Sequence, residues 1–157
     1  YSFGGIVAQD WASRNKVQRV VLLNSLHHEA RLRPLYKNLA ATGVLNWAPK
    51  GSIFRLIKFI TRLNSRPSRE LDLLLETMEQ FECQYYRWVL RAVLDWEHTT
   101  PLAPVDVILG ELDPVFTLQK PSKDRFWILK GATHLSFTSH SNEISNLLKE
   151  KIDPVLL

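Results

Sequence analysis

Three short apolar runs constrain the fold of this 157-residue chain more than any other feature. They lie at residues 18–24, 105–110 and 126–130, and they are rich in aliphatic, β-branched and aromatic side chains. Runs of this length and composition are typical of strands buried inside a sheet. The residues at 6–14 and 143–152 instead show helical spacing of their apolar positions. We therefore expect an α/β protein in which helices alternate with the strands of a parallel sheet.

The stretch 26–100 separates the first two expected strands and is too long for a simple crossover. It is rich in Leu, Arg, Lys and Glu, with breaks at Gly and Pro positions. Its apolar spacing predicts helices at 29–42, 51–64, 68–79 and 80–97. We interpret 26–100 as a helical lid inserted into a core domain made of 1–25 and 101–157.

Composition and charge bear on the class of partner. The net charge is +4, but basic and acidic residues are interleaved along the chain, so we expect no nucleic-acid partner. No apolar run reaches the length of a membrane-spanning helix. The single cysteine, Cys83, excludes an internal disulfide and favours a reducing, cytoplasmic location. We expect Cys83 to be a packing residue in a lid helix.

Three polar residues stand where a parallel sheet carries its functional loops, at the carboxyl ends of strands. Ser2 precedes a Gly-Gly pair and an expected helix, whereas Asp113 and His134 each follow an expected strand. A serine hydroxyl becomes a strong nucleophile when an imidazole takes its proton, and a carboxylate holds that imidazole in the required tautomer. The pattern predicts that these three side chains meet.

The same segments resemble the α/β-hydrolase family. Residues 1–5, Tyr-Ser-Phe-Gly-Gly, resemble its nucleophile elbow. Residues 105–114 resemble the strand and loop that deliver the acid, and 128–137 resemble the segment that delivers the histidine. The resemblance covers essentially the whole chain and is loosest over 26–100. It implies the C-terminal portion of an α/β-hydrolase core at 1–25 and 101–157, with 26–100 as its lid.

The resemblance also implies a role for each residue. Ser2 would be the nucleophile, His134 the proton carrier, Asp113 the acid, and the backbone N–H of Phe3 an oxyanion donor. The implied activity is that of a serine hydrolase of carboxylesterase or lipase type, without a cofactor. It would cleave an ester or related acyl bond of a small hydrophobic substrate through an acyl-enzyme. Thioesterase, peptidase, acyltransferase and C–C hydrolase activities stay open, because the same three residues catalyse all of them.

Two parts of the family pattern do not occur in these residues. The first glycine of the elbow and the loop with a second oxyanion donor would both precede Tyr1. Complete members would carry roughly a hundred further residues upstream, on the usual size of such domains. We therefore expect 1–157 to be a fragment of the enzyme that is poorly soluble and inactive when expressed alone.

The acid has two rivals in the sequence, Asp106 and Glu111. Asp106 lies inside the expected strand, and Glu111 follows its end too closely. Some family members place the acid after the preceding strand instead, where this chain has Asn24 and Ser25, neither of which is ionisable. These positions favour Asp113.

The remaining histidines and aromatic residues have less specific interpretations. We expect solvated loop positions for His27, His28, His98 and His140, with His27 or His28 as a candidate pocket residue. No HExxH spacing occurs, so no metal site is expected. Four aromatic residues have two interpretations, packing in the core or lining an apolar pocket: Tyr85, Tyr86, Trp88 and Trp96.

Two other functions compete with the hydrolase. The broad apolar surface of the expected helix at 51–64 fits a lid helix packed over the core, or an amphipathic surface that contacts lipid. The chain would then be a membrane-surface module. The second alternative is a catalytically silent α/β-hydrolase homologue that acts as a binding protein.

Overall fold

A computed structural model of the chain describes residues 1–27, 30–32, 69–80, 82–97, 99–118 and 125–152, with scattered positions between 34 and 62. The chain divides into two compact units. The first contains 1–31 and 98–157, and the second contains 32–97. The site residues expected from the sequence all belong to the first unit.

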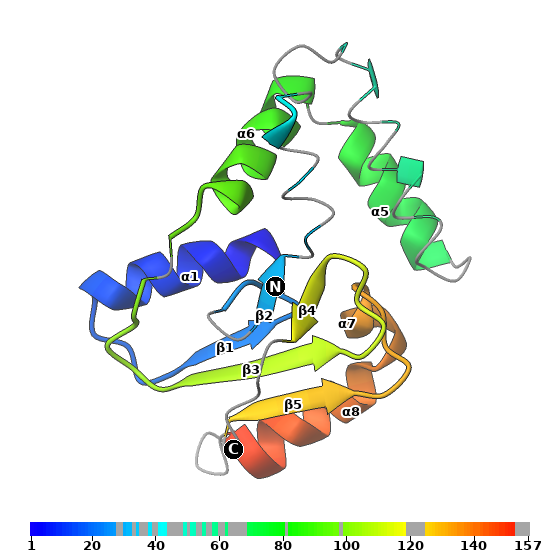
Figure 1. Ribbon diagram of the computed structural model, residues 1–157. Coiled ribbons are helices and arrows are strands. Elements are labelled where there is room, and N and C mark those ends of the chain that lie inside the picture. The colour runs from blue at the N-terminus through cyan, green and yellow to red at the C-terminus, as the bar shows by residue number, and fades with distance from the viewer. Residues whose placement is uncertain are drawn as a thin grey trace. The chain divides into compact units, whose positions relative to one another are not determined.

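The first unit is built on a sheet of three parallel strands (Figure 1). These are β1 (Val20–Leu23), β3 (Val105–Gly110) and β5 (Phe126–Leu129), with β3 in the centre. In this register Leu22 lies beside Val107, and Val107 lies beside Phe126. The expected parallel sheet in a mixed α/β fold is thereby confirmed.

Helices cover both faces of this sheet (Figure 1). Helix α1 (Phe3–Arg14) packs through Ala12 against Val107, whereas α8 (Ser141–Leu147) packs through Ile144 against Ile108. Neighbouring residues of a strand point to opposite faces, so α1 and α8 bury opposite sides of β3. Two buried faces explain why β3 is apolar at nearly every position.

The remaining elements of the first unit are short. Helix α7 (Ser136–Ser139) precedes α8, and α8 continues into a π-helical turn, η1 (Leu148–Ile152). Strands β2 (Ala30–Leu32) and β4 (Phe116–Leu118) pair in a separate sheet of two strands.

The sequence-based boundaries differ from the structure at several places. The helix expected at 6–14 begins at Phe3, and the strand expected at 18–24 spans Val20–Leu23. The helix expected at 29–42 is wrong at residues 30–32, which form β2. Strands of three residues such as β2 and β4 carry too few positions to show a period of two, so no pattern revealed them.

The second unit contains α5 (Arg69–Glu79) and α6 (Cys83–Leu94), where helices are expected at 68–79 and 80–97. Helix α5 buries Leu71 and Leu75, one turn apart. Tyr85 and Trp88 are exposed on α6, with ring centroids 6.1 Å apart. In the helix expected at 51–64, the described positions 51, 52, 55, 58, 59 and 62 are helical. The other positions of that range and the side chain of Tyr86 lie outside the described residues.

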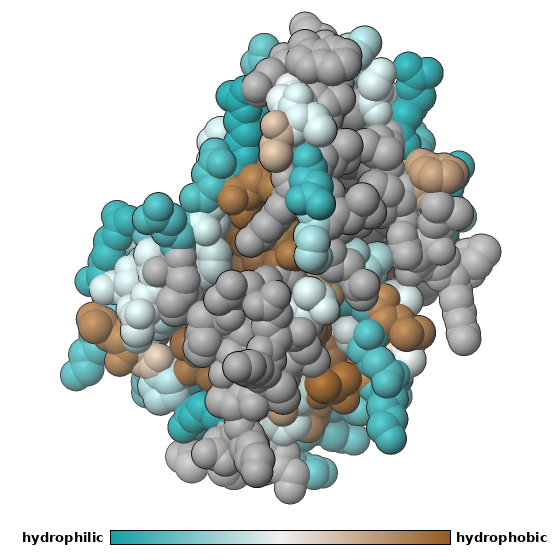
Figure 2. Space-filling view, viewed as in Figure 1, coloured by the Kyte–Doolittle hydropathy of each residue, from teal (hydrophilic) through white to brown (hydrophobic). Residues whose placement is uncertain are grey.

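The visible surface mixes apolar and polar residues (Figure 2). Val7 and Trp11 are among the apolar side chains exposed on α1. Isolated apolar side chains are common on the surfaces of folded proteins. Over the part of the chain that the structure describes, no helix has the length and apolar character needed to cross a membrane.

Candidate functional site

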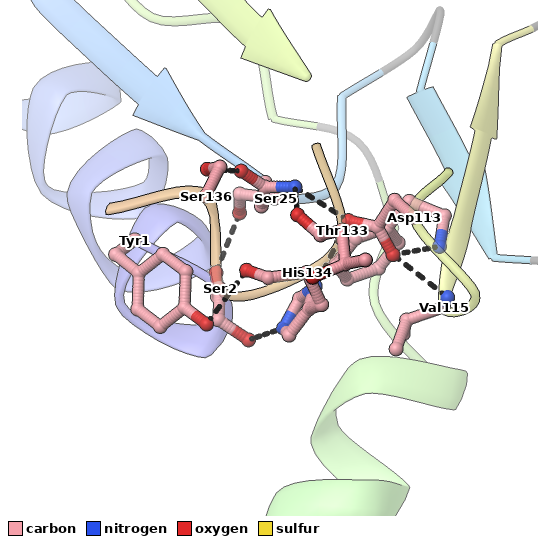
Figure 3. A network of polar contacts seen from close by, with 10 residues as sticks. Tyr1, Ser2, Ser25, Asp113, Val115, Thr133, His134 and Ser136 are labelled. Carbon is pink, nitrogen blue, oxygen red and sulfur yellow. Dashed lines mark hydrogen bonds and ion pairs between the residues drawn. The ribbon is translucent and has the colours of Figure 1, made fainter. Parts of the chain in front are cut away.

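The structure brings Ser2, His134 and Asp113 together beyond the carboxyl ends of the strands (Figure 3). Ser2 Oγ lies 3.0 Å from His134 Nε2, and His134 Nδ1 lies 2.9 Å from Asp113 Oδ2. An ionised carboxylate only accepts hydrogen bonds, so Nδ1 carries the imidazole proton and donates it to Asp113. Nε2 of the neutral ring is then the acceptor for the Ser2 hydroxyl.

Ser2 occupies a strained turn directly before α1. Its backbone has φ +48° and ψ −128°, a conformation that residues with a Cβ rarely adopt. Three hydrogen bonds hold it there: its N–H donates to the Leu23 carbonyl at 3.0 Å, and its own carbonyl accepts from the Gly5 N–H at 3.0 Å and from Ser25 Oγ at 2.6 Å. Since Leu23 ends β1, the turn and its hydroxyl are attached to the edge of the sheet.

The glycine pair after Ser2 has one sterically required member. A Cβ on Gly5 would lie 2.2 Å from Ser25 Oγ and 2.6 Å from Ser25 Cβ. A Cβ on Gly4 would meet no atom within 4 Å. The neighbour at Gly5 is thus the side chain whose hydroxyl donates to the Ser2 carbonyl.

The Asp113 carboxylate is fully buried and accepts hydrogen bonds on both oxygens. Oδ1 accepts from the N–H groups of Val115 at 2.7 Å and Phe116 at 3.1 Å, while Oδ2 accepts from His134 and from Asn24 Nδ2 at 2.7 Å. Burial raises the pKa of Asp113, but the hydrogen bond and charge of His134, together with the Asn24 and Phe116 hydrogen bonds, lower it by more. The carboxylate is therefore ionised at neutral pH.

Asn24 joins this network without having been predicted as a site residue. It is fully buried directly after β1 and has φ +45°. Its Nδ2 donates to Asp113 and, at 3.3 Å, to the Thr133 carbonyl, while its Oδ1 accepts from Ser136 Oγ. An Asn immediately after a strand is the one sequence signal of this role, since Asn tolerates the left-handed region better than most residues.

The two rival acids face other partners. Glu111 accepts a hydrogen bond from the Gly131 N–H at 2.9 Å through Oε2. Asp106 lies near the opposite end of β3, where its Oδ2 is 3.1 Å from Arg19 and 3.6 Å from Arg125. Neither carboxylate is positioned to hold the imidazole.

The loops that carry Asp113 and His134 are in direct backbone contact. The N–H groups of Glu111 and Leu112 donate to the carbonyls of Leu129 at 3.0 Å and Ala132 at 2.9 Å. A Cβ on Gly110 would lie 2.5 Å from the Ala132 carbonyl oxygen and 2.7 Å from that of Thr133. The close approach of the two loops therefore depends on a glycine at position 110.

Aromatic rings surround part of the imidazole. The ring centroid of Tyr1 lies 5.4 Å from that of His134 and 4.8 Å from that of Phe137. The ring centroid of Phe116 lies 5.6 Å from that of His134. The Tyr1 hydroxyl donates to the His134 carbonyl at 2.9 Å (Figure 3). Burial and the negative charge of Asp113 both raise the pKa of this phenol, so it stays protonated as a donor.

The predicted oxyanion donor is the backbone N–H of Phe3. Phe3 is the first residue of α1 and follows Ser2 directly, so its N–H belongs to the helix N-terminus. The N-terminal end of a helix carries a partial positive charge, which favours negative charge beside it. The prediction for Phe3 thus coincides with the start of a twelve-residue helix.

Of the other histidines, His27 departs from expectation and His140 agrees with it. His27 is buried, not solvated, because the loop at 25–27 folds inward where Gln9 donates to the Leu26 carbonyl at 2.8 Å. His140 lies at the surface, with its Nε2 3.2 Å from the Lys130 carbonyl oxygen. His28 and His98 lie outside the described residues. Among the residues that can be described, no three His, Cys, Asp or Glu side chains gather as metal ligands.

No protein-family model matches the chain, and no curated protein matches its sequence. The site is therefore interpreted from its own geometry and chemistry.

Proposed function

We propose that this protein is a serine hydrolase that cleaves an ester or related acyl bond of a small hydrophobic substrate. The observation that carries the proposal is the hydrogen-bond chain from Ser2 Oγ through His134 to Asp113, at 3.0 and 2.9 Å. Nucleophilic catalysis needs this arrangement, in which a base contacts the nucleophile and a third group orients the base. The strained turn at Ser2 adds support, because it presents the hydroxyl outward from the helix start.

The proposed reaction has two halves. Ser2 Oγ attacks the substrate carbonyl as its proton passes to His134 Nε2, and Asp113 stabilises the imidazolium that results. The Phe3 N–H donates to the oxyanion, and collapse of this intermediate expels the alcohol, which takes the proton from His134. Water then attacks the acyl-enzyme, gives a proton to His134, and releases the acid while Ser2 recovers its hydrogen.

We extend the proposal to the finer fold, the C-terminal part of an α/β-hydrolase core with residues 26–100 as its lid. Support comes from three parallel strands with helices on both faces, and from a candidate site at their carboxyl ends. The apolar substrate is supported by Tyr1 and Phe137, each about 41% exposed close to His134. Partly exposed rings beside the nucleophile favour an apolar acyl or alcohol group.

A fluorophosphonate probe and p-nitrophenyl esters test the proposal on the full-length protein. Wild type should be labelled and should turn over the esters, whereas Ser2→Ala should lose labelling and on the order of a millionfold in kcat. The exposed Ser141 is the matched control, and Ser141→Ala should behave as wild type. Activity of Ser2→Ala within about tenfold of wild type would place the nucleophile elsewhere. A folded but unlabelled wild-type protein would favour the binding-protein alternative.

A further inference from the structure

Asn24 is a buried polar side chain for which the proposed reaction has no role. It lies at the carboxyl end of β1, whereas the acid and the histidine follow β3 and β5. Its three side-chain hydrogen bonds nevertheless run to residues 113, 133 and 136, at sequence separations of 89, 109 and 112. A single amide thus connects the loop after β1 to both of the other loops.

Asn24 donates to the same Asp113 oxygen that accepts the hydrogen bond from the His134 imidazole. Oδ2 accepts from Asn24 Nδ2 at 2.7 Å and from His134 Nδ1 at 2.9 Å, while Oδ1 is occupied by two backbone N–H groups. A carboxylate with donors on both oxygens cannot rotate without breaking hydrogen bonds. The Asn24 amide therefore helps to determine where Oδ2 points.

The amide is itself oriented by a buried hydroxyl. Ser136 Oγ donates to Asn24 Oδ1, which leaves the Nδ2 group to face Asp113 and the Thr133 carbonyl. Both residues are fully buried, so water does not replace these bonds. Turning the amide over would place its oxygen against a carboxylate and a carbonyl, which is electrostatically unfavourable.

We propose that Asn24 is a positioning residue that holds the Asp113 carboxylate and the start of the histidine loop in register, with Ser136 fixing the orientation of its amide. This inference rests on the proposed function, since it assigns Asn24 to the acid and base of that reaction. The backbone agrees with it: φ +45° is accessible to Asn and Asp at small cost.

Two titratable groups among the described residues are coupled to the Asp113 carboxylate. They are His134, which acts on it by hydrogen bond and charge, and the Tyr1 phenol, whose own pKa the carboxylate raises. Glu111 bonds to Gly131, and Asp106 pairs with arginines near the other end of β3. A new carboxyl group at position 24 would be in direct contact with the Asp113–His134 pair.

Asn24→Asp in the full-length protein is the sharpest variant, because it preserves the shape and tolerates the backbone conformation but replaces the amide donor with a second carboxyl group beside Asp113. Two carboxyl groups this close share a proton, and whatever negative charge they add favours the imidazolium, so the His134 resonances should titrate at higher pH than in wild type. NMR titration of labelled histidine measures this without substrate. The acidic limb of kcat/KM for a p-nitrophenyl ester should move to higher pH, and kcat should fall on the order of a hundredfold with little change in KM.

Two further variants separate positioning from packing. Ser136→Ala removes the donor that fixes the Asn24 amide and so weakens the hydrogen bond from Nδ2 to Asp113, which leaves more negative charge for the imidazolium. The His134 midpoint should therefore move in the same direction by less. Gln9→Met is the matched control, because Gln9 is an equally buried amide whose donor bonds go to Gly5 and Leu26. It should lower the melting temperature without moving the His134 midpoint.

The outcomes distinguish this inference from the proposed function. An upward shift of the His134 midpoint in Asn24→Asp, absent in Gln9→Met, supports the positioning role even where no ester is hydrolysed. An active wild type with an unchanged midpoint in both Asn24→Asp and Ser136→Ala overturns the role and leaves the hydrolase proposal intact. Should Asn24→Asp fail to fold, the midpoint of Ser136→Ala decides.

Discussion

The two ends of β3 each bury an aspartate, and the two carboxylates have very different surroundings. Asp106, near the amino end, lies 3.1 Å from Arg19 and 3.6 Å from Arg125. Asp113, beyond the carboxyl end, accepts from two backbone amides, an Asn amide and an imidazole. Both side chains are almost fully buried, so burial alone does not separate them.

The two carboxylates differ in whether their partners can gain and lose a proton. A guanidinium keeps its proton at any ordinary pH, so the cluster around Asp106 neutralises charge and joins β3 to the residues that directly precede β1 and β5. An imidazole exchanges its proton near neutral pH, and a carboxylate held by uncharged donors is free to stabilise it in either state. A buried acid is therefore a candidate for chemistry when one of its partners can titrate, and a structural group when its partners are fixed cations.

The largest expected effect is on turnover at the Asp113 end. Asp113→Asn should lower kcat by roughly four orders of magnitude, because the amide no longer fixes the imidazole tautomer that accepts the Ser2 proton. Steady-state hydrolysis of p-nitrophenyl esters by the full-length variant measures this. If kcat changed by less than about tenfold, Asp113 would be no more than a structural acid.

At the other end of β3, replacing Asp106 should lower the stability of the protein and leave its turnover unchanged. Asp106→Asn removes the charge between Arg19 and Arg125, both partly exposed, and should cost about 1–3 kcal/mol in the free energy of unfolding. Denaturant unfolding gives that value, and the kcat of the same sample should match wild type. A large loss of kcat with unchanged stability would contradict the structural role assigned to Asp106.

The smallest effect is expected at Glu111, the acid nearest to Asp113 in sequence. In Glu111→Gln the amide oxygen can still accept from the Gly131 N–H, so the loss of stability should stay under about 1 kcal/mol. Turnover should be nearly unchanged. Were Glu111→Gln inactive and Asp113→Asn active, the acid would have to be Glu111.

The sheet was predictable because its strands carry strong local patterns. β3 was found at the expected residues, since a strand buried on both faces is apolar at almost every position. The meeting of the three side chains was predictable from Asp113 and His134, which each follow a strand, and from Ser2, which precedes a Gly-Gly pair and a helix. Both inferences need only the local sequence and the rule that parallel strands end at the same edge.

The supporting contacts were not predictable in the same way. Asn24 was noted only as a residue without a carboxylate, and its bonds to positions 113 and 136 have no local pattern. The same holds for Gly5 and Ser25, whose close contact depends on how α1 lies against the end of β1. Such contacts follow from the assembled loops, which no periodicity in the chain encodes.

The close approach at Gly110 has a consequence for how this gene product tolerates mutation. Even the smallest side chain there would press on two carbonyl oxygens of the loop that carries His134. In a saturation-mutagenesis screen scored by activity, position 110 should accept glycine alone, although it touches neither the nucleophile nor the imidazole. A substitution at position 110 lies away from Ser2, yet it should be among those that lower activity most.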